Sequence, residues 1–247
     1  SVVTQPDRPK GRGQESQATP VKLFALANGL AVLQPAKVNT PEFVEILRQQ
    51  APDVIVVVAF GQILSAKVLA VPRIFCVNLH ASLLPKYRGA APINWAIMNG
   101  EMETGVTTMK MDVGMDTGDM LLAQKIIIKE TDTAQTLHDT LCREGAGLVL
   151  ETLRRLEQQS LVPVPQDNLQ ASYAPKLKKE DGLIRWDKRA AEIRNQVRGL
   201  EPWPGAYAFY KSKRLKICKV EASSGETQGK PGEILRLSDY GIEVGTG

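Results

Sequence analysis

The chain has 247 residues, of which 43% are hydrophobic and 23% charged, and its formal net charge is +4. This is the composition of a globular protein with a sizeable core, and it excludes disordered, collagen-like and coiled-coil chains. The longest apolar run, residues 54–60, is far shorter than the roughly 20 residues that span a bilayer, and the N-terminus lacks a signal-peptide pattern. We therefore expect a soluble protein that is not secreted and meets no membrane.

The three cysteines, Cys76, Cys142 and Cys218, are widely spaced and form no Cys-x-x-Cys pair. This spacing argues against a disulfide framework and against a zinc ribbon, so we expect no metal. Free thiols fit a reducing compartment. We therefore expect a cytoplasmic protein, in the bacterial cytosol or in an organelle matrix.

The charge is unevenly distributed along the chain. Residues 1–170 carry 16 Lys and Arg against 17 Asp and Glu, whereas residues 171–247 carry 15 against 10. The whole basic excess therefore lies in the last third of the chain. Such a region can bind a polyanion by releasing counterions from phosphates, although a solvated surface would show the same excess.

Helix-like and strand-like segments alternate in the first two thirds of the chain. Residues 40–42 have the pattern of a helix N-terminus, with Phe43, Val44 and Leu47 facing inward at helical spacing. The β-branched run at 54–59 predicts a parallel strand covered on both faces. The later predicted elements are a strand at 74–78, a helix at 91–98, strands at 105–111 and 120–128, and a long helix that opens on Asp132 with Gln135 and ends at Gln158.

This alternation predicts an α/β layered domain with a mostly parallel sheet over residues 1–160, whose site lies beyond the carboxyl ends of the strands. Residues 161–174 contain prolines and polar side chains with little periodicity, so we predict a linker. Short strands between Gly and Ser turns predict a small β-barrel domain at 175–247. Its predicted elements are a helix at 190–198 and strands at 206–210, 215–220, 232–237 and 241–244.

Both ends of the chain have the pattern of interrupted sheets. The strand-like stretch at 1–3 has no turn before it, and the last predicted strand lacks the partners that would close a barrel. Because unpaired sheet edges invite association with other chains, we expect the native chain to be longer.

Asn78 and His80 close the second buried strand and lead into a loop with Pro85 and Gly89. Residues two apart on a strand share a face, so an amide and an imidazole can point into one space. This pair suits a carbonyl whose oxygen becomes negative during attack by a nucleophile. A histidine at a strand end is also common as a purely structural residue, and that alternative stays open at this point.

The second polar window is DVGMDTGD, residues 112–119. Its three aspartates lack the later bidentate Glu of a calcium-binding EF-hand loop, so we expect no metal there. The glycines allow the backbone to turn sharply and to approach a ligand closely. A carboxylate held in this loop could orient His80 and collect a proton, whereas a turn with solvated aspartates is the alternative.

Together the two windows resemble the formyltransferases that use 10-formyltetrahydrofolate. The resemblance rests on Asn78 and His80, on the string SLLPKYRGAAPINWAI at 82–97, and on the D-x-G-x-D-T-G loop that contains Asp116. It extends from residue 1 to about residue 233. Within the family it is closest to the branch that formylates methionyl initiator tRNA, because the QPDRPKGRGQ segment and the basic C-terminal region are similar to that branch's tRNA-binding loop and domain.

The resemblance implies a Rossmann-like formyltransferase domain, a linker and an OB-like domain. It implies that the α-amine of methionine on initiator tRNA attacks the formyl carbon, that Asn78 and His80 stabilise the oxyanion, and that Asp116 holds His80 and manages the proton. No metal and no covalent enzyme intermediate is implied. Contacts with the folate are implied for Phe60, Gly61, Gln62, Ile63, Leu64, Ser82, Leu83, Leu84, Pro85, Asp112 and Gly114.

The same resemblance implies contacts with tRNA and a monomer without an obligate protein partner. Arg12 is the expected specific contact in a flexible basic loop, although a solvated surface loop would have the same composition. Trp203, between two prolines, is expected to plug the core or an interface rather than to stack on a base. The expected tRNA contacts are Arg8, Lys10, Arg12, Lys176, Lys178, Lys211, Lys213 and Arg214.

Several alternatives remain open. A sugar-nucleotide N-formyltransferase or a formyltetrahydrofolate hydrolase domain would share Asn78, His80 and Asp116, but the basic loop and the basic C-terminal domain argue against both. An inactive RNA-binding module would not need the three polar residues together. A Cys76 nucleophile paired with His80 is the rival enzyme, and no basic group or helix N-terminus near Cys76 would lower its pKa.

Overall fold

The computed structural model describes residues 1–10, 15–223, 229–239 and 241–247. They fall into two compact units that interleave along the chain. Unit 1 consists of Ser1–His80 and Met109–Asp119, and unit 2 consists of Ala81–Thr108 and Met120–Gly247. Among the described residues, no helix has the length and apolar character needed to cross a membrane.

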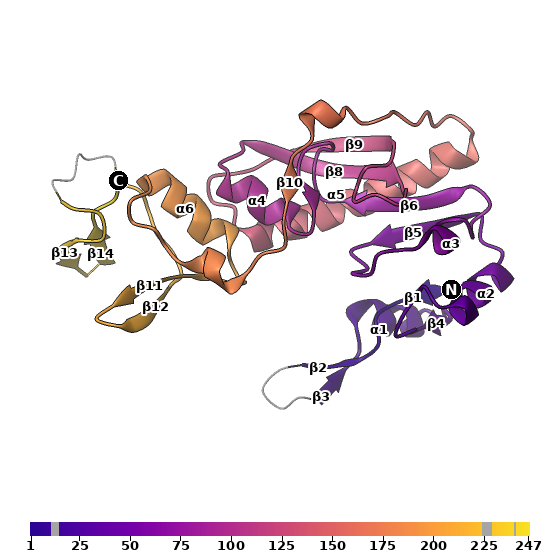
Figure 1. Cartoon of the computed structure of the whole chain (residues 1–247), viewed down its shortest axis with the longest axis horizontal. Helices are drawn as coiled ribbons and strands as arrows, with labels where there is room; N and C mark the ends of the chain where they lie inside the picture. The colour runs from indigo at the N-terminus through magenta and orange to yellow at the C-terminus, as the bar shows by residue number, and fades with distance from the viewer. Residues whose placement is uncertain (11–14, 224–228, 240) are drawn as a thin grey trace. The chain divides into compact units, whose positions relative to one another are not determined.

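Unit 1 is built, in its described residues, from short helices, two parallel strand pairs and one antiparallel pair. Its elements, labelled in Figure 1, are β1 (Val2–Val3), β2 (Arg8–Lys10), β3 (Glu15–Gln17), α1 (Pro20–Ala27), β4 (Val32–Leu33), α2 (Pro41–Gln49), β5 (Val54–Val58), α3 (Ala66–Leu69) and β6 (Phe75–His80). β1 pairs in parallel with β4, and β5 pairs in parallel with β6, from Val54 opposite Phe75 to Val58 opposite Leu79. The two predicted strands are therefore confirmed as a parallel pair, and β6 extends as far as His80. The expected cover on both faces of β5 was wrong, because Val56 and Val58, which share one face, are 39% and 54% exposed.

The core of unit 1 lies against α2. Thr40 Oγ1 accepts a hydrogen bond from the Phe43 backbone N at 3.3 Å, and Pro41 occupies the first turn, which confirms the predicted helix start. Burial of each large apolar side chain contributes about 1.5–3 kcal/mol relative to leaving it exposed. The buried cluster consists of Val38, Phe43, Val44, Leu47, Leu64 and Val68. Phe60 and Met111 pack against this cluster, so the loops that follow β5 and residue 110 are both anchored on the same core.

The segment predicted as a flexible basic loop at 5–14 is in part a β-hairpin. β2 pairs antiparallel with β3, with Arg8 opposite Gln17. At the base of the hairpin the Asp7 carboxylate lies 2.6 Å from Lys22 Nζ and accepts a hydrogen bond from Gln34 Nε2 at 2.7 Å. The hydrogen bond from Lys22 holds the pKa of Asp7 below its usual value. Pro, Gly and charge indicate a loop locally, whereas pairing with a later strand decided the structure.

Unit 2 contains the remaining elements. They are β7 (Arg88–Gly89), α4 (Pro92–Met98), β8 (Glu103–Lys110, whose last two residues belong to unit 1), β9 (Met120–Ile127), α5 (Ala134–Glu157), the 3₁₀ helix η1 (Asn168–Gln170), β10 (Tyr173–Ala174), the 3₁₀ helix η2 (Lys179–Gly182), α6 (Ala190–Gly199), β11 (Ala206–Tyr210), β12 (Lys213–Ile217), β13 (Ile234–Ser238) and β14 (Gly241–Val244). β8 and β9 are neighbouring strands in one sheet.

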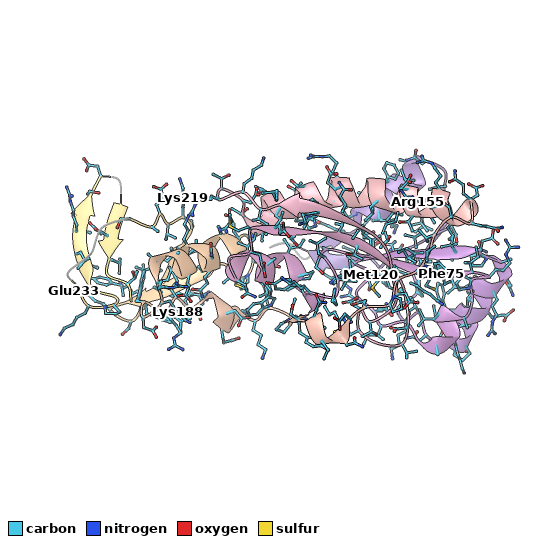
Figure 2. All side chains as sticks on the ribbon, turned by 90° about the horizontal axis from the view of Figure 1, so that it is seen from above. Phe75, Met120, Arg155, Lys188, Lys219 and Glu233 are labelled. Atoms are coloured by element: carbon cyan, nitrogen blue, oxygen red, sulfur yellow. The ribbon has the colours of Figure 1, made fainter. Side chains whose placement is uncertain are left out.

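The predicted linker is bound along its length to earlier parts of unit 2. Val164 bridges to Met120, which is labelled in Figure 2, through two backbone hydrogen bonds of 2.8 Å. The Arg88 guanidinium, with only 2% of the residue exposed, donates to Gln166 Oε1 and Asn168 Oδ1 at 2.7 and 2.9 Å. β10 then pairs in parallel with β7. A stretch without periodicity is therefore held in place by side chains and backbone groups distant in the sequence.

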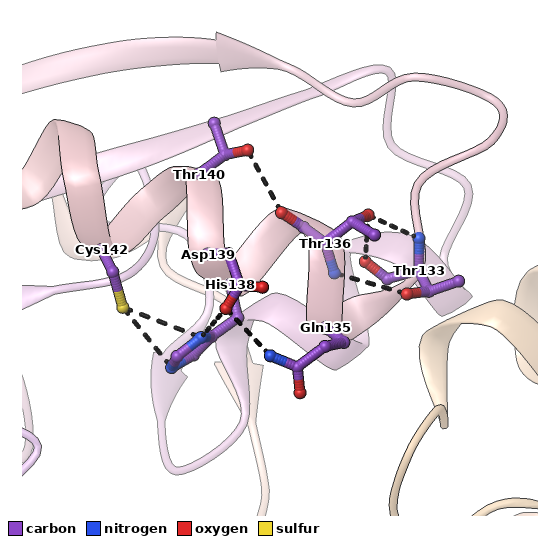
Figure 3. A network of polar contacts seen from close by, with 7 residues as sticks. All are labelled: Thr133, Gln135, Thr136, His138, Asp139, Thr140 and Cys142. Carbon is purple, nitrogen blue, oxygen red and sulfur yellow. Dashed lines mark hydrogen bonds and ion pairs between the residues drawn. The ribbon is translucent and has the colours of Figure 1, made fainter. Parts of the chain in front are cut away.

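The long helix α5 has its N-cap one residue later than the predicted Asp132 (Figure 3). Thr133 is the N-cap, and its Oγ1 accepts from the Thr136 backbone N at 3.4 Å. Thr136 Oγ1 in turn accepts from the Thr133 backbone N at 3.0 Å, which completes a capping box. Asp132 instead accepts from the Lys129 backbone N at 2.8 Å, so the predicted pair of Asp132 with Gln135 was wrong. Both Asp and Thr cap helices well, and the preceding turn decides between them.

The C-terminal part of unit 2 is joined to α4 through α6. Asn94 Nδ2 donates to the Gly199 carbonyl at 2.7 Å, and Trp95 Nε1 donates to the Pro175 carbonyl at 2.8 Å. Ala91, Leu177 and Leu200 form a small buried cluster at the same place. Of the predicted C-terminal elements, α6, β11 and β14 lie at the predicted positions.

β12 and β13 differ from the predicted strands at 215–220 and 232–237. The register of β12 is set by the two-residue turn at Lys211 and Ser212, which both have positive φ values, 45° and 65°. Neither residue is typical of such a turn, so the sequence did not reveal it. The described strands form two antiparallel pairs, β11 with β12 and β13 with β14. A closed barrel stays a prediction.

Candidate active site

β6 carries the first two candidate residues. Asn78 and His80 are two positions apart on this strand, so their side chains leave the same face of the backbone. Pairing with β5 fixes the strand, with Asn78 opposite Val57. Only 7% of the His80 side chain is exposed, and Asn78 is half-buried. The end of β6 therefore presents an amide and an imidazole together on one face.

The loop after β8 is held by its own backbone and side chains. The Lys110 backbone N donates to the Asp119 carbonyl at 2.9 Å, and the Met111 backbone N donates to the Cys76 carbonyl of β6 at 2.8 Å. Inside the loop the Asp112 carboxylate accepts from the Gly114 backbone N at 2.9 Å and from Thr117 Oγ1 at 2.8 Å. The loop is therefore tied to the same strand that carries Asn78 and His80.

Asp116 meets His80 from this loop. Asp116 Oδ2 lies 3.6 Å from His80 Nδ1, and 18% of the Asp116 side chain is exposed. Asp116 has a φ of 53°, in the left-handed region that Asp adopts more readily than most residues. This distance is longer than a hydrogen bond, and contacts of catalytic groups often tighten only when substrate binds. The structure thus brings together His80 and Asp116, which the sequence places in separate windows.

Gly118 and Thr117 were missed as parts of the site. A Cβ on Gly118 would lie 1.8 Å from the Lys110 carbonyl oxygen, so only glycine fits between the two ends of the loop. Thr117 holds the Asp112 carboxylate through its hydroxyl. The spacing D-x-G-x-x-T-G was visible in the sequence. It does not reveal, however, which residue faces the ligand and which supports the loop.

The residues from Phe60 to Leu64 follow β5 in unit 1 and divide into two groups. Leu64 is buried in the core, and Phe60 packs against that core. The Gln62 side chain accepts from the Val38 backbone N at 3.2 Å and donates to the Ala36 carbonyl at 3.3 Å. Gly61 has a φ of 79°, and Ile63 is 80% exposed. Ile63 is therefore the apolar side chain of this segment that remains available to a ligand.

The residues from Ser82 to Pro85 form a turn in unit 2. Ser82 is fully buried, and its Oγ donates to the Lys86 carbonyl at 2.6 Å. Thr107 Oγ1 donates to the Ser82 carbonyl at 2.7 Å and accepts from the Leu84 backbone N at 3.2 Å. The side chains of Ser82 and Leu84 are thus buried in the turn, and Leu83 and Pro85, which are half-buried, are the more accessible of the predicted contacts. No sequence pattern pointed to Thr107.

Comparison with known proteins identifies the family. Residues 1–153 match the formyl transferase family model, and residues 176–247 match the model of the formyl transferase C-terminal domain. The methionyl-tRNA formyltransferase of Citrifermentans bemidjiense is 56% identical over 247 residues, which cover 100% of this chain and 77% of that protein. The methionyl-tRNA formyltransferase of Geobacter sulfurreducens has the same identity and coverage. The chain belongs to the methionyl-tRNA formyltransferase family.

A solved structure shows the same fold. The N-formyltransferase from Helicobacter canadensis, in complex with folinic acid and dTDP-3-aminofucose, has a TM-score of 0.71 and 22% identity, and covers 98% of this chain and 83% of that one. At this identity the likeness concerns the fold alone. The predicted formyltransferase domain with a mostly parallel sheet and a second C-terminal domain is thereby confirmed. As a methionyl-tRNA formyltransferase family member, the chain is a formyl-transferring enzyme.

The predicted tRNA contacts of this methionyl-tRNA formyltransferase family member lie in several segments. Arg8 is exposed on β2, where its Nη2 donates to Gln5 Oε1 at 3.2 Å. Lys10 ends the same strand, and Arg12 lies outside the described residues. The exposed members of the set in unit 2 are Lys176, Lys178, Lys211, Lys213 and Arg214.

The cysteine alternative has no support in the site. Cys76 is buried, and burial raises the pKa of its thiol to about 11. A thiol with this pKa stays protonated near neutral pH and is a poor nucleophile. The other histidine, His138, is exposed on α5 beside Asp139 and Cys142 (Figure 3).

Alkylation should distinguish the three thiols. At pH 8, iodoacetamide should modify Cys142 and Cys218, which are exposed, and leave Cys76 unmodified in the folded protein. The raised pKa of Cys76 also means that its contribution to stability is complete below its ordinary value of 9.0 and is lost as the pH rises towards 11. Mass spectrometry of the modified peptides measures the pattern. Rapid modification of Cys76 at pH 8 without unfolding would contradict it.

Proposed function

We propose that this chain transfers the formyl group of 10-formyltetrahydrofolate to the α-amino group of methionine esterified to initiator tRNA, in bacterial translation initiation. The observation that carries the proposal is the approach of Asp116 to His80 at the end of β6, with Asn78 on the same face of the strand. An amide, an imidazole and a carboxylate together are the groups that acyl transfer to an amine requires. The identity of 56% to methionyl-tRNA formyltransferases supports the choice of acceptor.

In the proposed reaction the methionine nitrogen attacks the formyl carbon, and the carbonyl electron pair moves to the oxygen. The Asn78 amide and the His80 imidazole donate hydrogen bonds to that oxyanion. Asp116 holds the imidazole and receives the proton that the amine loses, directly or through a water molecule. When the electron pair returns, the bond between the formyl carbon and the folate nitrogen breaks, and that nitrogen takes up a proton. No metal is required at any step.

The folate would bind beside the two loops of unit 1. Ile63 from one loop and Val113 and Met115 from the other are large apolar side chains with 80%, 75% and 60% of their surface exposed. A flat pterin ring that covers such side chains would remove apolar surface from water. Phe60, Gly61, Gln62 and Leu64 would support the first loop, and Asp112 and Gly114 would support the second. The folate contacts that we propose in unit 2, from the family resemblance alone, are Ser82, Leu83, Leu84 and Pro85.

The acceptor tRNA would be held by basic residues outside the catalytic groups. The excess of 15 Lys and Arg over 10 Asp and Glu in residues 171–247 supports this part of the proposal. We also propose a catalytic domain at 1–160, a linker at 161–174 and a tRNA-binding domain at 175–247. We further propose that the protein is cytoplasmic and is a monomer without an obligate protein partner. The proposed contacts are Arg8, Lys10, Arg12, Lys176, Lys178, Lys211, Lys213 and Arg214.

The decisive experiment offers three acceptors to the wild-type protein with 10-formyltetrahydrofolate. They are methionyl initiator tRNA, a dTDP-amino sugar and water alone. We expect formylmethionyl-tRNA on acid gels, no formylated sugar, and folate release that depends on the tRNA. Formylation of the sugar would instead assign the chain to sugar-nucleotide chemistry, and release in water alone would make it a hydrolase. Tight binding of tRNA without transfer would indicate an inactive RNA-binding module.

A further inference from the structure

The hairpin formed by β11 and β12 lies in the most basic part of the chain. Residues 202–220 contain five Lys and Arg and no Asp or Glu. Among the described residues, only Lys219 of these five forms an ion pair, with Glu221 at 3.2 Å. No carboxylate of the described residues therefore neutralises the positive charges of the hairpin itself, which favours an anionic partner. The five basic residues are Lys211, Lys213, Arg214, Lys216 and Lys219.

The register of this hairpin gathers aromatic and basic side chains on one face. Tyr207 is opposite Lys216, and Phe209 is opposite Arg214. Directly opposite residues of an antiparallel pair share a face, and so do residues two apart on one strand. One face therefore presents two aromatic rings and two cations. We call these four residues, Tyr207, Phe209, Arg214 and Lys216, the hairpin face (β11 and β12 in Figure 1).

The aromatic rings of the hairpin face are held in defined positions. The rings of Tyr207 and Phe209 meet edge to face, with centroids 5.8 Å apart and planes at 88°. The Arg214 guanidinium carbon lies 3.8 Å from the centre of the Tyr207 ring. A Cβ on Gly182 would lie 3.1 Å from that ring, so the Tyr207 ring lies close against the Gly182 backbone. The Ile184 backbone N also donates to the Tyr207 carbonyl at 2.8 Å.

Phe209 has no such cover, and 60% of its surface is exposed. An exposed phenyl ring next to a fixed guanidinium is poorly suited to duplex RNA, whose base faces are stacked on one another. It is well suited to an unpaired base, because every base offers a π-face and the flanking phosphates can meet cations. Trp203, expected to plug the core or an interface, is 52% exposed and lies just before this hairpin in the sequence.

We propose that the hairpin face binds an unpaired nucleotide of RNA, with Phe209 stacked on the base and with Arg214 and Lys216 beside its phosphates. The proposal deepens the proposed function. It rests on that function for one assumption, which is that the bound RNA is the acceptor tRNA. It adds a stacking contact to a surface for which the sequence indicated phosphate contacts alone.

The test measures binding of the full chain to two fluorescein-labelled RNAs by anisotropy. One is a single-stranded oligouridylate of about 12 nucleotides, and the other is a blunt duplex of equal length. Phe209→Ala should weaken single-strand binding by about 5- to 100-fold, change duplex binding by less than about twofold, and leave the salt dependence unchanged. Phe209→Trp should retain single-strand binding. Lys213→Ala, in contrast, should weaken the binding of both RNAs. It should also reduce the slope of the logarithm of the binding constant against the logarithm of the salt concentration by about one.

Phe24→Ala is the matched control, because Phe24 is a phenylalanine on α1 that is 69% exposed and lies outside the hairpin. If Phe209→Ala behaved like Phe24→Ala, or weakened both RNAs equally, the stacking proposal would be refuted. Preference of the wild type for phosphatidylserine vesicles over RNA would also overturn it. Since oligouridylate binding requires no catalysis, a wild type that binds through Phe209 but transfers no formyl group would refute the proposed function alone.

Discussion

His80→Ala should lower the kcat of formyl transfer by about 10³-fold, because the variant loses a donor to the oxyanion and the group that Asp116 orients. Asp116→Asn should lower kcat by about 10²-fold, since an amide keeps the shape of the loop but cannot collect the proton. In both variants the KM for methionyl-tRNA should change little, because neither side chain belongs to the proposed tRNA surface. Initial rates at saturating tRNA and folate measure the effect.

The matched control is His138→Ala, which removes the other histidine of the chain. His138 is 54% exposed on α5 and contacts Asp139 and Cys142, so its removal should leave kcat unchanged. If His80→Ala kept more than about a tenth of wild-type turnover, His80 would not be the group that stabilises the transition state. Equal loss in the two histidine variants would indicate a general effect on folding instead.

Gly118→Ala should lower kcat by about 10²-fold even though the residue touches no substrate in the proposed reaction. The new Cβ would lie 1.8 Å from the Lys110 carbonyl oxygen, so the loop that carries Asp116 must move. A displacement of about 1 Å at a catalytic group is enough for a loss of this size. Turnover and the thermal unfolding midpoint should be measured together. The midpoint should fall only modestly, because the loop lies outside the buried core of unit 1.

Gly147→Ala provides the comparison for this substitution. A Cβ there would meet no atom within 4 Å, and the position lies inside α5. Alanine in a helix is more favourable than glycine by about 0.5–1 kcal/mol, so this variant should keep full activity and gain stability. Wild-type turnover in Gly118→Ala would mean that the position of Asp116 does not limit the reaction. Loss of activity in both variants would point to aggregation or misfolding.

The sequence by itself determined the features that depend on short-range patterns. The start of α2 follows from Thr40 and Pro41, and the parallel strands β5 and β6 follow from runs of β-branched and apolar residues. Asn78 and His80 share a face because side chains alternate along a strand with a period of two. The division of charge between the first two thirds and the last third of the chain also needs no structure. All these features arise from residues a few positions apart.

Only the tertiary structure decided which distant residues meet. The contact between His80 and Asp116 depends on the loop closed between Lys110 and Asp119, where Gly118 alone fits. The turn that buries Ser82 is held by a hydrogen bond from Thr107, which lies on β8.

The same reason explains the wrong and missing predictions. Thr133 rather than Asp132 caps α5, and β2 is a strand because it pairs with β3. The hairpin face exists because positive φ values at Lys211 and Ser212 set the register of β11 and β12. Such a contact becomes favourable only after the chain has closed the loop that joins the two contacting residues. Their energies therefore depend on the whole fold and leave no periodic pattern in the sequence.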